Sequence, residues 1–213
     1  MKTMKKTVAL LVAVSMIVGC VIGATLAWLT SKADPVVNTF TTSDIEVTLK
    51  ETTGGTNREF QMIPGWTIDK DPKVTVKEGS EDCWLFVEIT EENDLRKYIS
   101  YCTAEGWTRG EGFGDGKNGV PTDCIFRQVK KDDTTKTFSI IGYMNGDAFV
   151  ADKVLVENTV TKTDMNALNK STYPKLTFTA YASQLYKSNV GSDAERMFTA
   201  AEAWANAQPT TTP

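Results

Sequence analysis

Short segments of alternating or β-branched apolar residues recur between residues 45 and 182, and this pattern limits the fold more than any other feature. Turn residues separate them at intervals of about 8–12 residues, which is typical of antiparallel sandwiches. The segments expected to form strands are 45–49, 74–76, 83–89, 125–129, 137–143, 149–150, 154–156 and 176–182. Segment 83–89 is the most apolar and is expected at the centre of a sheet. The chain is predicted to be mainly β, an antiparallel, jelly-roll-like β-sandwich.

Two or three short helices are expected beside the strands. One covers Asn93 to Ile99 with Asn93 or Asp94 as its cap, and another runs from a Thr163-Asp164 cap to Leu168. The clearest helix lies near the C-terminus, where Ser192-Asp193-Ala194-Glu195 matches a capping box. Its apolar face has helical spacing and comprises Ala194, Met197, Phe198 and Ala201, with Trp204 and Ala205 beyond.

The N-terminus has the pattern of an export signal. Lys2, Lys5 and Lys6 precede a stretch without charged residues that ends at Lys32. Cleavage after Ala27 would leave Trp28 as the first residue of the mature chain. Two alternatives stay open: residues 17–20 can act as a lipobox with Cys20 lipidated, or the segment can remain as an uncleaved anchor, since it is long enough to span a bilayer. We expect contact with the membrane only if the signal stays uncleaved and anchors the protein there.

The expected organisation is a signal peptide (1–27), an N-terminal segment (28–42), a β-sandwich domain (43–207) and a flexible tail (208–213). Loss of the three signal lysines takes the net charge from −4 to −7. A body this acidic argues against nucleic acid or anionic lipid as a partner. The chain contains no histidine, which excludes histidine-based catalytic triads and histidine-ligated zinc.

No motif points to an enzyme or a cofactor. Residues 114–119 fit G-x-G-x-x-G, but Pro121 follows where a nucleotide site needs a helix, so we interpret them as a loop. Glu91 and Glu92 could form an acid/base pair, but nothing in the sequence indicates that these adjacent carboxylates line a cleft. The other acids that could bind calcium lie outside the usual ligand pattern and are interpreted as surface charge: Asp69, Asp71, Glu81, Asp82, Asp132 and Asp133. We therefore expect no catalytic, cofactor-binding or metal site.

Three cysteines remain after signal cleavage, so at most one intramolecular disulfide can form. Cys102 and Cys124 flank the glycine-rich region and are the best pair. Buried free thiols at Cys83, Cys102 and Cys124 are an equally good interpretation.

Several segments resemble the TasA/camelysin (CalY)-type family. Residues 23–30, Asn38-Thr39-Phe40-Thr41 and the strand at 45–49 are similar to that family's N-terminus. Weaker similarity continues through Ile63-Pro64-Gly65 to residues 176–184 and the Trp204 helix. The chain departs from the pattern after Ala27, where Trp28-Leu29 replaces Tyr-Phe.

The resemblance implies a protein exported by a Gram-positive bacterium, processed by a SipW-type signal peptidase and located at the cell surface or in the biofilm matrix. It implies a structural subunit that forms extracellular fibres with other copies of itself by donating an N-terminal strand. A monomeric surface-binding or adhesive module is the alternative, and a camelysin-like metallopeptidase is disfavoured because histidine is missing.

The segment 28–42 is the candidate donor strand. It is too apolar for a solvated tail and has no helical spacing. Its expected anchors are Trp28, Leu29, Val36, Val37 and Phe40. The alternative is that this segment pairs with its own domain as an intramolecular edge strand.

Overall fold

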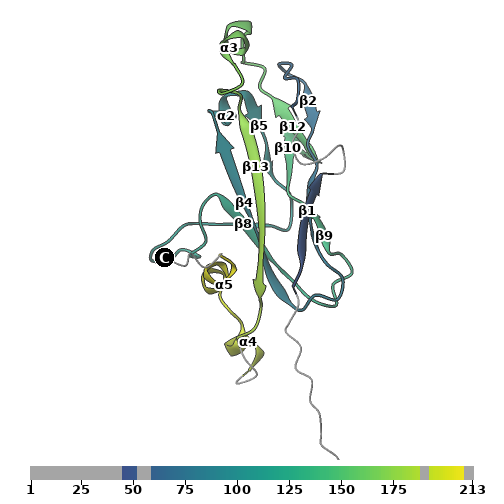
Figure 1. Ribbon diagram of the computed structural model, residues 1–213, viewed down its shortest axis with the longest axis vertical. Coiled ribbons are helices and arrows are strands. Elements are labelled where there is room, and N and C mark those ends of the chain that lie inside the picture. Colours follow the sequence, from purple (N-terminus) through teal and green to yellow (C-terminus); the bar gives the residue numbers. More distant parts are fainter. Residues whose placement is uncertain (1–44, 52–58, 188–191, 209–213) are drawn as a thin grey trace, which may run out of the picture. The chain divides into compact units, whose positions relative to one another are not determined.

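The computed structural model describes residues 45–51, 59–187 and 192–208 (Figure 1). Contacts divide the chain into the units Met1–Thr42 and Ser43–Pro213, and every described residue belongs to the second. The expectations for the signal peptide and the donor segment therefore lie outside the described residues, as does the tail beyond Gln208.

The predicted fold class is confirmed, because the domain is mainly β with antiparallel sheets. Within the described residues, the largest sheet has four strands. Their spatial order is β13 (Lys175–Gln184), β4 (Cys83–Glu92), β8 (Cys124–Val129) and β7 (Thr108–Arg109). The central position expected for segment 83–89 is confirmed, since β4 pairs with β13 along ten residues and with β8 along six.

Three smaller antiparallel sheets complete the strands of the described region. The first has the order β1 (Val47–Glu51), β3 (Pro72–Val76) and β9 (Thr137–Ser139). The second has the order β11 (Ala148–Ala151), β10 (Ile141–Asn145) and β6 (Cys102–Thr103). The third has the order β2 (Thr67–Asp69), β12 (Lys153–Val156) and β5 (Ile99–Ser100). The expected strand 137–143 is thus divided at Ile140 between β9 and β10.

The main core lies between the four-stranded sheet and the smaller sheets. Alternate residues of β4 point into it, among them the fully buried Leu85 and Val87. Val74 of β3 and Val156 of β12 meet them from the smaller sheets and are also fully buried. This layered arrangement gives the domain its sandwich character.

The opposite face of the four-stranded sheet is covered by the C-terminal helix α5 (Ala200–Ala207) (Figure 1). Trp204 of the helix makes edge-on ring contacts with Phe86 of β4 and Tyr181 of β13, at centroid distances of 5.4 and 5.5 Å. Because both faces of β4 are covered, its sequence is almost continuously apolar rather than alternating.

The two middle helices form close to where they were expected. Helix α2 (Leu95–Tyr98) follows Asp94, which lies in the left-handed region and caps it without a side-chain hydrogen bond. Helix α3 (Lys162–Ala167) is capped by Thr161 rather than by Thr163, with Asp164 completing a capping box.

The prediction of one C-terminal helix starting at Ser192 is wrong. The chain forms a short helix α4 (Asp193–Arg196) and then the separate α5. Met197 pairs in a β-bridge with Tyr186, and Thr199 caps α5 through a capping box with Glu202. Among the described residues, no helix is long and apolar enough to cross a bilayer.

The glycine-rich segment 107–121 is a loop, as expected, although it begins with β7. Asn118 and Glu111 exchange hydrogen bonds between their side chains and backbones across the loop. No helix follows Gly119, so the nucleotide-binding interpretation is excluded by the fold.

Candidate functional site

One edge of the four-stranded sheet carries an unusually long exposed strand. In the described part of the chain, β13 pairs with β4 on one side and with no strand on the other. A ten-residue strand directs about five N–H and five C=O groups towards a free edge, because alternate residues hydrogen-bond to opposite sides. Such an edge can accept another strand.

The strand β1 is the neighbouring edge, on the first three-stranded sheet (Figure 1). Cα atoms of β1 and β13 approach within 8 Å, yet the two strands do not pair. A strand inserted between them needs about 9.6 Å, which is twice the usual strand spacing. Insertion of a strand between β13 and β1 therefore requires β1 to move by at least about 1.6 Å at these points.

Apolar side chains that contact the core from these two edges are only half-buried. They are Val47 and Leu49 on β1, and Leu176, Phe178 and Ala180 on β13. Residues equally close to the core on β3 and β4 are fully buried. The margin of the core along the two edges is thus incompletely covered by the described residues.

Lys70 links the two edges at one end of this margin. Its ammonium group forms an ion pair with Glu51 at the end of β1. It also lies 5.8 Å from the ring centroid of Phe178 on β13 and 5.7 Å from that of Phe60. Lys70 therefore holds β1 near β13 without a strand pairing between them.

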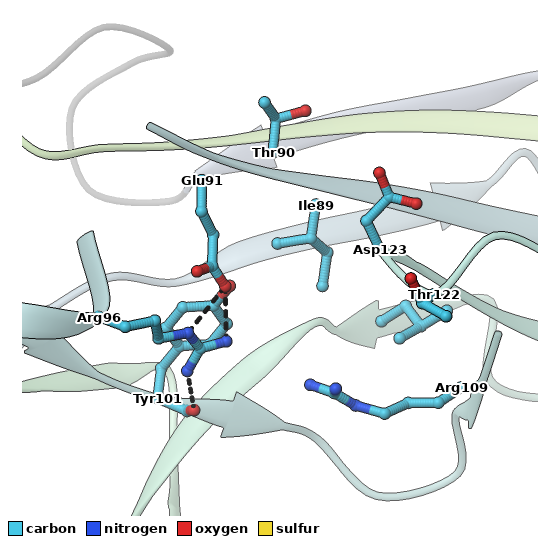
Figure 2. A pocket seen from close by; sticks show the side chains of 9 residues that line it. Ile89, Thr90, Glu91, Arg96, Tyr101, Arg109, Thr122 and Asp123 are labelled. Carbon is cyan, nitrogen blue, oxygen red and sulfur yellow. Dashed lines mark hydrogen bonds and ion pairs between the residues drawn. The ribbon is translucent and has the colours of Figure 1, made fainter. Parts of the chain in front are cut away.

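A separate polar pocket of about 370 Å³ lies at the end of β4 (Figure 2). Its floor contains Ile89 and Ile125, which are 7% and 2% exposed. Its walls are polar and comprise Thr90, Glu91, Arg96, Tyr101, Arg109, Thr122 and Asp123.

One wall of this pocket is a closed hydrogen-bond network. Glu91 accepts hydrogen bonds from Arg96 at 2.8 Å and from the Tyr101 hydroxyl at 2.6 Å. The Arg96 guanidinium also donates to the Tyr101 carbonyl and lies over its ring at 3.8 Å. Burial favours a higher pKa for Glu91, but these two hydrogen bonds outweigh it, and its pKa falls below the ordinary value.

The opposite wall carries two charges with few partners. Arg109 extends into the pocket from β7 (Figure 2), and its Nε donates to the Thr103 hydroxyl at 3.4 Å. Within the described residues, neither the Arg109 guanidinium nor the Asp123 carboxylate has an ion-pair partner.

The disulfide suggested for Cys102 and Cys124 is not formed. Cys83, Cys102 and Cys124 are all free thiols, and Cys83 and Cys124 are buried. Burial raises the pKa of Cys83 to about 11 and that of Cys124 to about 12, so both thiols are protonated at neutral pH.

The surface acids considered as calcium ligands lie near lysines. Asp69 pairs with Lys153, and Glu81 pairs with Lys131. The structure, across the residues it describes, contains no group of three or more His, Cys, Asp or Glu side chains placed to hold a metal.

The sequence does not reveal the pocket. Its only signal there is the adjacent pair Glu91-Glu92, whereas the structure brings Glu91 together with Arg96, Arg109 and Asp123. The predicted cleavage residues Ala27 and Trp28 lie outside the described residues, as do the donor anchors Trp28, Leu29, Val36, Val37 and Phe40.

Comparison with known proteins provides no relative: no family model, no curated protein and no solved structure matches the chain.

Proposed function

We propose that the chain is an exported, non-catalytic structural subunit that assembles with copies of itself into extracellular fibres. In this proposal, the segment Trp28–Thr42 of one subunit pairs with the free edge of β13 on the next. The single observation that carries the proposal is the ten-residue edge of β13, whose core-facing side chains are half-buried.

The donor segment is long enough to cover the whole edge. Fifteen residues in extended conformation span about 50 Å, and the ten residues of β13 span about 33 Å. Val36 and Phe40 lie on the same face of an extended strand and would cover Leu176 and Phe178 at the margin of the core, whereas Val37 lies on the other face. Each Å² of apolar surface removed from water contributes about 25 cal/mol.

The contact is head-to-tail, because a segment at one end of the subunit binds an edge elsewhere on the next. Such a contact does not close on itself, so it propagates as a filament. The resemblance of residues 23–49 to fibre-forming TasA-type proteins supports the same proposal, as does the export signal expected at residues 1–27. SipW-type processing after Ala27 would release the segment for pairing.

A paired substitution on β13 tests the proposal. Ala180→Lys places a charge among the core-facing side chains of the edge, a known means of blocking strand addition. Thr179→Lys adds the same charge to the exposed face of the same strand and is the matched control. We expect electron microscopy to show fibres of the wild type and of Thr179→Lys, and monomers of Ala180→Lys that still unfold cooperatively.

Deletion of residues 28–40 is the complementary test. Fibres should vanish while the remaining domain keeps a cooperative unfolding transition. Fibres that persist, or a domain that no longer folds, would refute the donor-strand role. The second result would instead favour pairing of the segment within its own domain.

The polar pocket favours a second candidate, the surface-binding module. A folded monomer that binds a small ligand and forms no fibres at any concentration would support it.

A further inference from the structure

We propose that the pocket at the end of β4 binds a small ligand that carries a carboxylate, and that Arg109 recognises this carboxylate. The inference goes beyond the fibre proposal and does not depend on it. The ligand class is a carboxylate with a hydrogen-bond donor at its other end, a chemistry found in uronic acid sugars and in free amino acids.

The charges on the pocket walls point to an anion at Arg109. Arg96 is already neutralised by Glu91, at 2.6 Å between Nη2 and Oε1. Among the described residues, Arg109 donates one hydrogen bond, the long one from Nε to Thr103, and it forms no ion pair, although its charge contributes to the lowered pKa of Glu91. Its two terminal nitrogens therefore face the pocket as a planar fork, the geometry that binds carboxylates through two parallel hydrogen bonds (Figure 2).

The floor of the pocket shields one side of this interaction, although Arg109 itself is exposed. Ile89 and Ile125 are buried members of the main core, so they exclude water from one side of the pocket. An ion pair beside such a floor is less weakened by solvent than a pair on an open surface. The same floor suits the C–H face of a sugar ring or an aliphatic side chain.

Asp123 supplies the second recognition group. Its carboxylate has no side-chain partner among the described residues and borders the pocket beside Thr122. It can accept a hydrogen bond from a ligand hydroxyl or ammonium. Since the pocket measures about 370 Å³, near the lower limit of ligand sites, it fits one sugar or amino-acid residue rather than a chain of them.

The closed network on the opposite wall keeps this geometry rigid. Glu91, Arg96 and Tyr101 hold one another through three hydrogen bonds and a stacked ring. Because these groups are already saturated, a ligand does not have to break them, and the site is preorganised.

The experiment is a titration of the purified mature chain, followed by saturation-transfer NMR, which observes the ligand and therefore works for monomers and fibres alike. The probes are galacturonate, galactose and alanine. Galactose is the matched neutral sugar, because it has the ring and hydroxyls without the carboxylate. We expect galacturonate or alanine to bind about tenfold or more tightly than galactose. The stronger of the two identifies the source of the carboxylate.

Variants assign the effect to the pocket. Arg109→Gln should weaken binding of the carboxylate probe about tenfold or more, and Arg109→Lys should restore part of it by keeping the charge without the fork. Lys117→Gln, in the adjacent loop, removes a positive charge outside the pocket and should leave binding unchanged. Thermal unfolding of each variant checks that it is folded. Absence of detectable binding by both carboxylates, equal binding of galactose, or unchanged binding by Arg109→Gln overturns the proposal.

Discussion

Replacing Trp204 by alanine should detach helix α5 from the four-stranded sheet. Trp204 is 9% exposed and contacts Phe86 and Tyr181 edge-on. Truncation of a buried tryptophan costs about 3–5 kcal/mol, and each ring pair contributes about 0.5–1.5 kcal/mol beyond the area that it buries. Since an eight-residue helix at the surface can detach without unfolding the sandwich, we expect a loss near the lower limit, about 3 kcal/mol.

Urea unfolding followed by circular dichroism measures this loss, and the dependence of the unfolding free energy on urea should fall as well, because a native state with α5 detached exposes less new surface on unfolding. Trp66→Ala is the matched control, because Trp66 is 66% exposed and its truncation should change stability by less than about 0.5 kcal/mol. Hydrogen exchange should also accelerate in α5 and not in β4. A loss below about 1 kcal/mol for Trp204→Ala would contradict the reasoning that this ring anchors the helix.

Three further perturbations have defined outcomes. Gly110→Ala should prevent native folding or lower the melting temperature strongly, because a Cβ there collides with the Pro121 carbonyl oxygen. The hydrogen bond from Lys187 lowers the pKa of Glu202 to about 2, so its contribution to stability is complete above pH 4.5 and is lost as the pH falls towards 2. The melting temperature of Glu202→Gln should therefore fall less than that of the wild type between pH 5 and pH 2.5, and an equal fall would contradict the assignment. Cys124 should not react with a thiol reagent at pH 8 until the protein is unfolded, because burial raises its pKa to about 12; rapid labelling of the native protein would show that it is accessible.

The longer strands could be predicted from the sequence because each has a local signal, whereas the two- and three-residue strands β2, β5, β6 and β7 were not predicted. Segment 83–89 is continuously apolar, and the structure explains this by covering both faces of β4. Apolar and polar residues alternate at 45–49 and 74–76 because one face of β1 and of β3 is directed towards the core and the other is less buried.

The division of the C-terminal helix could not be predicted, because the sequence offers two overlapping start signals. Ser192 with Glu195 and Thr199 with Glu202 both match a capping box, and the spacing of Met197 and Phe198 joins them into one apparent helix. A helix forms after each signal, and tertiary contacts separate the two: the Phe198 N–H donates to the Leu185 carbonyl, and the Phe198 carbonyl accepts from the Trp84 indole.

The pocket is invisible in the sequence for a similar reason. Its charged residues, Glu91, Arg96, Arg109 and Asp123, come from different elements and share no fixed spacing. Only the packing of β4, α2, β7 and the segment before β8 brings them together.

The central claim is that residues 28–42 of one subunit pair with β13 of another, and a mixed-isotope cross-linking experiment tests it most directly. A photoreactive amino acid is placed at Phe40, and mature chains carrying nitrogen-14 or nitrogen-15 are mixed before assembly and irradiated. We predict cross-linked peptide pairs in which position 40 from one isotope is joined to residues 175–184 of the other. Cross-links that join only peptides of the same isotope would contradict the claim and show that the segment pairs within its own domain.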